Sequence, residues 1–131
     1  MIVVKDKIGL TEYLEDKKLI ISTYKGIVES DLSFSHLSKV VAFYKVNEVK
    51  GAVIDLQNLY GSFVRVMEYL TESFYPIASK SGLKAQAYIL KDDLIIKNMA
   101  EKLKILGKKF NIEARTFSNK EEALKWIESV I

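Results

Sequence analysis

The chain has 131 residues, 49% of them hydrophobic, and its 20 lysines and arginines against 17 aspartates and glutamates give a net charge of +3. This length and apolar content suit one compact core, so we expect residues 1–131 to form a single domain. The chain contains no cysteine, which excludes disulfides and cysteine nucleophiles and fits a cytoplasmic protein. No apolar stretch approaches the ~20 residues of a membrane-spanning helix, so we expect no integral membrane segment.

The positive charge is only weakly concentrated. Its densest cluster, between Lys102 and Lys109, falls in a segment whose helical spacing places lysines beside Glu101 on a solvent-exposed face. Nucleic-acid-binding surfaces combine basic residues with arginines or aromatic side chains directed at phosphates or bases. The only arginines here are Arg65 and Arg115, so we expect no nucleic-acid partner.

The N-terminal part of the chain predicts an antiparallel hairpin. Side chains alternate from Leu10 to Asp16, and β-branched residues dominate from Leu19 to Tyr24, with a polar turn between them. A short strand at Ile2–Val4 is expected to precede the pair. A helix then begins near Ser30 and Asp31, because serine and aspartate favour helix starts and apolar residues follow at helical spacing.

The middle of the chain predicts a buried strand and a second helix. Ala52–Leu56 is a short apolar run, typical of a strand covered on both faces, and we expect residues 57–61 to form a loop. A helix is predicted from Ser62 onwards. Pro76 should end or kink this helix, because proline lacks an amide donor and clashes with the preceding turn.

The last part predicts two further strand and helix pairs. Strands are expected at residues 85–90 and 113–117. The helix between them begins at Asp92 or Asp93, has Ile95 on its buried face and ends near Gly107. Ser118 and Glu121 have the spacing of a capping box at the start of the final helix. Ala123, Trp126, Ile127 and Val130 share the buried face of that helix.

This order of elements predicts an α/β fold. We expect a single-layer mixed sheet of four to five strands, with an N-terminal antiparallel hairpin and about four helices. Right-handed crossovers would place the helices over a largely parallel sheet. Ligands usually bind beyond the carboxyl ends of such strands, which here indicates residues 55–63.

Three segments carry a resemblance to a known family. They are Tyr24-Lys25-Gly26 through Asp31-Leu32 at the end of the hairpin, Val53-Ile54-Asp55-Leu56 in the central strand, and Phe117 with Glu122-Ala123-Leu124-Lys125-Trp126-Ile127 at the end of the chain. The sequence resembles the STAS domains of anti-sigma-factor antagonists, particularly their SpoIIAA-like relatives, over nearly its whole length. This resemblance implies a regulatory role exerted through protein contacts. The SpoIIAA-like relatives also resemble CRAL-TRIO lipid carriers in topology, which makes an apolar ligand conceivable.

The phosphorylation motif of the STAS regulators differs here. Those proteins place a phosphorylatable serine in an Asp-Ser-Ser/Thr-Gly pattern after the Asp-Leu strand, whereas this chain has Tyr60-Gly61-Ser62-Phe63. The aspartate before the serine and the glycine after it are missing. Phosphorylation of Ser62 therefore remains a hypothesis that the motif itself does not support.

The candidate binding site follows the central strand. It comprises Asp55, Asn58, Tyr60, Ser62 and Phe63. Free amides at the start of the second helix would suit an anion such as phosphate or a carboxylate. The alternative is that Asp55 accepts nearby backbone amides and Ser62 only caps its helix.

Other chemical groups favour structural roles. His36, the only histidine, has Ser35 and Ser38 as neighbours and no adjacent carboxylate, so we expect it at the surface or boundary rather than in catalysis. The carboxylate pairs at residues 92–93 and 121–122 lie at predicted helix starts, where the helix dipole favours negative charge. We therefore predict neither a metal site nor a cofactor.

The second helix has more apolar surface than one buried face requires. Val64, Tyr69 and Tyr75 lie off its main stripe, and exposed aromatic residues of this kind often mark protein contacts. These residues form the candidate interface, for a protein partner or a homodimer. The alternative is a helix buried by neighbouring segments.

The sequence therefore favours a non-enzymatic regulatory or protein-interaction domain of STAS-like type. The alternative is a small-molecule or lipid-binding protein, with an apolar or anionic ligand in a pocket near the loop after the Asp55 strand or between the sheet and the second helix. An enzyme is the least supported class. The first class predicts little cavity volume and a surface that includes Tyr69 and Tyr75. The second predicts an enclosed apolar pocket, and the third predicts polar groups converging on His36 or Asp55.

Overall fold

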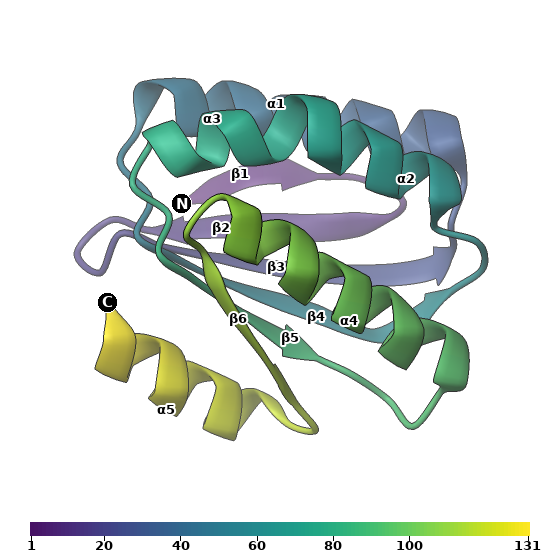
Figure 1. Cartoon of the computed structure of the whole chain (residues 1–131). Helices are drawn as coiled ribbons and strands as arrows, with labels where there is room; N and C mark the ends of the chain where they lie inside the picture. The colour runs from purple at the N-terminus through teal and green to yellow at the C-terminus, as the bar shows by residue number, and fades with distance from the viewer.

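The computed structural model describes residues 1–131, and a six-stranded sheet in the order β1-β2-β3-β4-β5-β6 forms its middle layer (Figure 1). The strands are β1 (Ile2–Lys5), β2 (Gly9–Leu14), β3 (Leu19–Ile27), β4 (Gly51–Tyr60), β5 (Ala85–Ile89) and β6 (Glu113–Phe117). The helical segments are α1 (Ser30–Val46), α2 (Val64–Tyr69), the π-helical turn η1 (Leu70–Phe74), α3 (Tyr75–Lys80), α4 (Leu94–Lys109) and α5 (Lys120–Val130).

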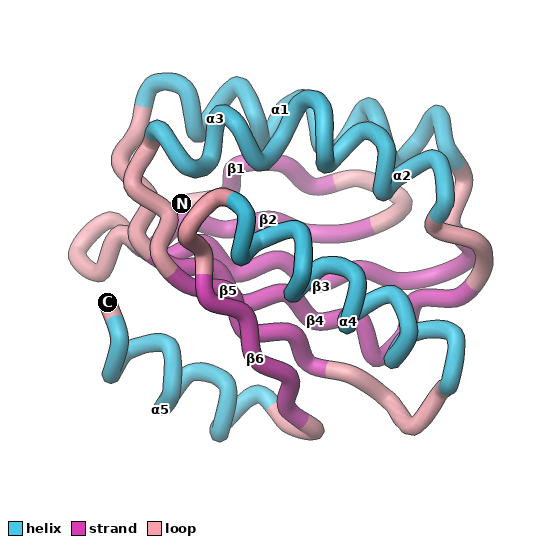
Figure 2. The backbone as a smooth tube through the Cα atoms, viewed as in Figure 1, coloured by secondary structure: helices cyan, strands magenta, loops and turns pink.

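The connectivity decides which helices share a face. β1, β2 and β3 pair antiparallel, whereas β3, β4, β5 and β6 pair parallel. Each parallel crossover advances by one strand in the same direction. Because such crossovers are right-handed, their helices all fall on one face of the sheet. Only α5 follows the last strand, and Figure 2 shows the strands separating it from α1 and α3.

The predicted α/β fold with its N-terminal hairpin is confirmed, with one strand more than the upper estimate. The main difference is in the central strand. β4 runs on to Tyr60, so the residues expected to form a loop after Leu56 continue the strand. They pair there with the extended end of β3, where Ile27 lies opposite Tyr60. The second half of β4 therefore has only one strand neighbour.

The second helical region continues through Pro76 instead of ending there. The helix passes through η1, where the Tyr75 amide bonds to the Leu70 carbonyl, five residues back. The wider turn accommodates a proline that cannot donate to the ladder. The extra residue in the turn also directs two consecutive side chains inward, so that Phe74 and Tyr75 are both buried.

The core divides at the sheet. On the face covered by α1 to α4 it contains 22 buried residues, including most of the buried aromatic side chains. On the face covered by α5 it contains seven, namely Leu19, Val53, Ala85, Ala87, Ile89, Ala123 and Ile127. Residues of the two sets alternate along the strands, because successive side chains of a strand point to opposite faces of the sheet.

Several local predictions are wrong. The cap of α5 is Asn119, whose side chain accepts the Glu122 amide at 2.9 Å, so the predicted capping box at Ser118 does not form. Ile95 is exposed rather than buried, because it lies on the outer side of the first turn of α4. Gly107 is an interior residue of α4.

The outer face of α5 is also more open than predicted. Trp126 is half-buried and Val130 is exposed, so only Ala123 and Ile127 of the predicted stripe reach the core. The Trp126 ring packs against Phe117, with their centroids 5.7 Å apart.

Candidate functional site

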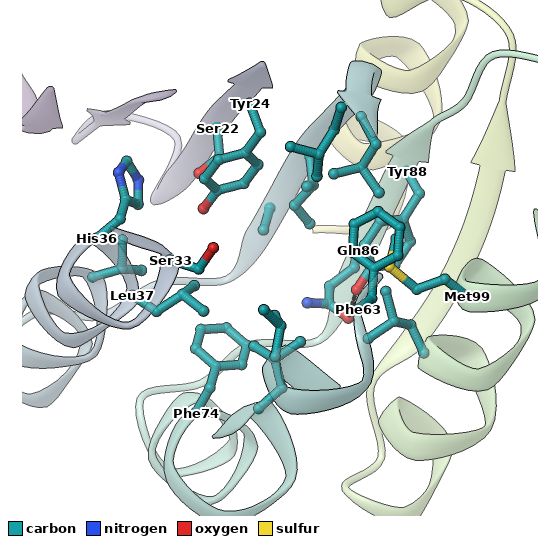
Figure 3. Close-up of a pocket in the computed structure, with 18 of the residues that line it drawn as sticks. Ser22, Tyr24, Ser33, His36, Leu37, Phe63, Phe74, Gln86, Tyr88 and Met99 are labelled. Atoms are coloured by element: carbon teal, nitrogen blue, oxygen red, sulfur yellow. Dashed lines mark hydrogen bonds between the residues drawn. The ribbon is translucent and has the colours of Figure 1, made fainter. Parts of the chain in front are cut away.

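A cavity of about 110 Å³ lies between the sheet and the helices that cover its larger core. Side chains from β3, β4, β5, α1, α4 and the α2–η1–α3 region line it, and 19 of the 23 lining residues are hydrophobic. Figure 3 shows these side chains surrounding the space. The cavity is lined mainly by apolar side chains and is partly open to the surface, whereas the small-molecule-binding alternative predicted an enclosed apolar pocket.

Small side chains on facing elements leave this space open. Ser22 on β3 and Ala52 on β4 line it from the sheet, and Ser33 lines it from α1. All three are buried. Larger side chains at these positions would close the gap between helix and sheet, because protein interiors are otherwise tightly packed.

Gln86 provides a polar group at the β5 end of the cavity. Its side chain is 2% exposed, and its Oε1 accepts hydrogen bonds from the Tyr75 and Tyr88 hydroxyls, each at 3.0 Å. Its amide nitrogen makes no hydrogen bond within the protein and points into the open space in Figure 3. Burial raises the pKa of both tyrosines, so their hydroxyls remain protonated donors.

Two residues of α1 add further polar groups to the cavity wall. Ser33 and Tyr44 are buried, lining residues, and their hydroxyls make no hydrogen bond within the protein. Burial raises the pKa of Tyr44 well above its usual value, so its hydroxyl is neutral. In Figure 3, the Ser33 hydroxyl points from α1 into the space beneath β3.

His36 is fully buried on the same side, at 0% exposure, so the expectation of a surface or boundary histidine is wrong. Its Nδ1 lies 3.0 Å from Asp6 Oδ2, and its Nε2 lies 2.8 Å from Thr11 Oγ1. The Thr11 hydroxyl is in turn 2.8 Å from Ser22 Oγ. Burial lowers the pKa of His36 despite the nearby Asp6 carboxylate, so the imidazole is neutral near pH 7.

This hydrogen-bonded chain connects the start of the fold with α1. The other carboxylate oxygen of Asp6 accepts the amides of Ile8 and Gly9, which fixes the carboxylate between β1 and β2. Both nitrogens of His36 are occupied by protein groups, and Thr11 is fully buried. Of the four groups, His36 and Ser22 line the cavity. The chain therefore holds one cavity wall in a defined geometry.

Sequence reasoning missed this arrangement because its members are far apart in the chain. Asp6 precedes His36 by 30 residues, and only hairpin formation brings the two together. Gln86 left a clearer signal, since it is the one non-aromatic polar residue in the short apolar strand Ala-Gln-Ala-Tyr-Ile. A buried polar side chain of this kind normally has a hydrogen-bonding role.

The predicted site after the Asp55 strand does not converge on one point. Asp55 Oδ1 accepts the Gln57 amide at 3.0 Å, as the structural alternative expected. Asn58, Tyr60 and Ser62 are exposed, whereas Phe63 is buried and lines the cavity. The second helical region starts after Phe63 without a side-chain cap, so Ser62 does not serve as one.

Tyr60 has a different neighbour. The Lys91 ammonium lies 3.2 Å from the centroid of its ring and donates a hydrogen bond to the Leu59 carbonyl at 3.0 Å. These contacts join the loop after β5 to the end of β4. They place the start of α4 beside the carboxyl ends of β3 and β4.

The three candidate interface residues differ in how exposed they are. Val64 is 66% exposed, and Tyr69 is half-buried and stacked on Phe34, with centroids 5.3 Å apart. Tyr75 is 0% exposed, so it is not available to a partner, and its predicted place in the interface is wrong. The π-helical turn explains this error, because it rotates Tyr75 from the outer side of an ordinary helix into the core.

A cluster of exposed apolar side chains lies where the parallel strands end. We call it the apolar edge, and it comprises Ile27, Tyr60, Val64, Leu94 and Ile95. Ile27 and Tyr60 are strand partners, and the Lys91 contacts bring the α4 start to them. In Figure 1, the starts of α2 and α4 both lie at this end of the sheet.

Two further features bear on the expected classes of function. None of the helices has the length and apolar character needed to cross a membrane. The structure also contains no group of three or more histidine, aspartate or glutamate side chains arranged to hold a metal ion.

Comparison with known proteins gives structural likenesses only. No protein-family model matches the sequence, and no curated protein matches it either. An uncharacterised DUF3478-family protein with a SpoIIAA-like fold from Shewanella loihica PV-4 is 18% identical, with a TM-score of 0.57 over 95% of this chain and 98% of that chain. An anti-sigma factor antagonist from Mycobacterium paratuberculosis is 13% identical, with a TM-score of 0.57 over 91% of this chain and 92% of that chain. The chain therefore has the SpoIIAA-like fold of STAS domains.

Proposed function

We propose that this chain is a non-enzymatic ligand-binding domain that takes up one small, largely apolar molecule in its internal cavity. The cavity, with its largely apolar lining, is the observation that carries this proposal. An empty cavity forfeits packing contacts. A ligand that fills the space restores those contacts.

The lining residues favour a largely apolar ligand over ordered water molecules as the occupant of the cavity. Ordered internal waters need several polar partners each, whereas most residues here are hydrophobic. Apolar cavities of about 150 Å³ in other proteins bind single aromatic rings. At about 110 Å³ this cavity is smaller, so the proposed ligand is at most a single ring with a short substituent.

Binding of ethylbenzene to the ¹⁵N-labelled protein tests this proposal, with amide shifts followed by two-dimensional NMR. Ala52→Ile provides the control, because the larger side chain extends from β4 into the cavity. We expect saturable shifts at the lining residues of the wild type and none in Ala52→Ile. Absence of saturable shifts in the wild type would contradict the proposal, as would equal binding by the filled variant.

The second candidate function is a regulatory protein-interaction domain, which the apolar edge specifically favours. Its five large side chains are exposed, and clusters of this kind often mark protein contacts. The similar structure of an anti-sigma factor antagonist supports a protein partner. Self-association through the edge is the form that can be tested without knowing another partner.

Sedimentation velocity shows whether the protein is a monomer or a homodimer formed through the apolar edge. If it forms a homodimer, the wild type sediments as a dimer, and Val64→Lys shifts it to monomer without changing its melting temperature. A matched substitution on another surface, Val46→Lys at the end of α1, should leave the dimer intact. A monomeric wild type over the whole concentration range would rule out self-association.

A further inference from the structure

The cavity wall contains no side chain with a formal charge. None of the lining residues is a lysine, arginine, aspartate or glutamate. The one lining histidine, His36, is buried and neutral near pH 7, with Asp6 and Lys39 as the nearby charged groups. Burial raises the pKa of the four lining tyrosines, so their hydroxyls are neutral near pH 7. They are Tyr24, Tyr44, Tyr75 and Tyr88.

A charged ligand would therefore enter without a partner. An isolated ion loses its hydration on burial, and this cost is repaid only by an opposite charge and by hydrogen bonds. Both nitrogens of His36 are engaged by Asp6 and Thr11, so the imidazole has no free donor for an anion. The anionic ligand that the sequence left open does not suit this cavity.

Gln86 determines which polar group fits instead. The two tyrosine hydroxyls that donate to its Oε1 hold the amide in one orientation, which leaves its NH₂ group facing the space. An NH₂ group is a donor only. It requires an acceptor oxygen, and no protein atom supplies one.

We propose that the cavity selects an uncharged molecule that has an apolar body and a carbonyl or similar acceptor oxygen, which the side-chain amide of Gln86 recognises. This inference rests on the proposed ligand-binding function and specifies its ligand class. The hydroxyls of Ser33 and Tyr44 also line the cavity, so a second polar group on the ligand would find a partner at either of them.

Three probes of similar size test the ligand class. Ethylbenzene is apolar, acetophenone adds a carbonyl oxygen, and benzoate carries a negative charge. We expect acetophenone to bind about threefold to tenfold more tightly than ethylbenzene, because it gives the Gln86 amide its missing partner. Benzoate should bind at least about 100-fold more weakly than acetophenone at pH 7.5.

Gln86→Met tests the role of the amide. Methionine has a similar shape and no donor, so the variant should lose the preference for acetophenone over ethylbenzene. Gln57→Met is the matched control, because Gln57 lies on the neighbouring strand β4 with its amide bonded to the Ser118 carbonyl outside the cavity. It should retain the wild-type preference. Thermal unfolding verifies that both variants are folded.

The outcomes separate the ligand class from the proposed function. Ethylbenzene binding without a preference for acetophenone would overturn the inference and leave the ligand-binding function standing. A preference that survives in Gln86→Met, or benzoate binding comparable to that of acetophenone, would overturn it too. If Gln86→Met does not fold, the wild-type probe series still decides the question. Binding of none of the three probes to the wild type would overturn both proposals.

Discussion

The cores on the two faces of the sheet differ in their residue types and in how closely they are packed. The face under α5 is covered by seven buried apolar residues, three of which are alanines that allow close approach of the helix. The face under α1 to α4 contains a cavity, several aromatic side chains and buried polar groups. The contrast shows that the α5 face is closely packed, whereas the other face holds the cavity on which the proposed ligand binding rests.

A single strand shows the contrast most clearly. All five residues of β5 are buried. Ala85, Ala87 and Ile89 face α5, whereas Gln86 and Tyr88 between them line the cavity. Because the side chains of a strand alternate, one apolar segment builds a closed core on one side and a cavity wall with polar groups on the other.

The largest expected effect concerns the closed face. Ile127→Ala should lower the free energy of unfolding by about 2–5 kcal/mol, because Ile127 is fully buried and the substitution removes core packing. Leu37→Ala, at a half-buried residue that lines the cavity, should cost less. Urea unfolding of both variants measures the difference. An equal cost would show that the two faces are packed alike.

Enlarging an alanine should have opposite consequences on the two faces. Ala87→Ile forces extra volume into the contact between β5 and α5 and should cost about 1–3 kcal/mol. Ala52→Ile extends into the cavity and should change stability by less than about 1 kcal/mol. Melting temperatures of the pair test this directly. Similar destabilisation by both changes would mean that the cavity cannot accept a larger side chain.

A pH dependence is expected from the polar side of the sheet. Burial lowers the pKa of His36 in the folded state, so below its usual pKa of about 6.5 the unfolded chain binds a proton that the folded chain does not. The free energy of unfolding should therefore fall as the pH decreases through this range, and His36 contributes no pH dependence above it. Unfolding at pH 7.5 and pH 5.5 should show a smaller decrease for His36→Asn than for the wild type. An identical decrease in both would contradict a neutral buried His36.

The smallest effect concerns the start of α5. Asn119→Ala removes the side chain that caps the Glu122 amide and should cost about 1 kcal/mol. Ser118→Ala should change stability by less than about 0.5 kcal/mol, because Ser118 makes no side-chain cap. Chemical denaturation of the two variants decides which residue begins the helix. A larger loss of stability for Ser118→Ala would support the predicted capping box at Ser118 instead.

The fold was predictable because it depends on local patterns. The apolar residues 85–90 were predicted as a strand, which the structure has at Ala85–Ile89. Asp93 was one of two predicted candidates for the start of α4, and it caps the Ile96 amide at 3.1 Å. The handedness of the crossovers predicted helices over a largely parallel sheet. Boundaries were predicted less well, because pairing with β3 extends β4 to Tyr60 beyond what its own residues indicate.

The cavity was predictable only in outline. A pocket between the sheet and the second helix was one of two alternatives, but its chemistry depends on contacts between distant segments. Tyr75 reaches Gln86 only because the π-helical turn rotates it inward, and helical periodicity placed it outside. Asp6 likewise meets His36 only after the hairpin has folded.

A crystal structure of the protein soaked with acetophenone tests the central claim most directly. The account predicts electron density for one probe molecule between β4, β5 and α1, with its oxygen within hydrogen-bonding distance of the Gln86 amide nitrogen. A cavity closed by movement of the α2–η1–α3 region, or filled only by ordered water, would contradict it.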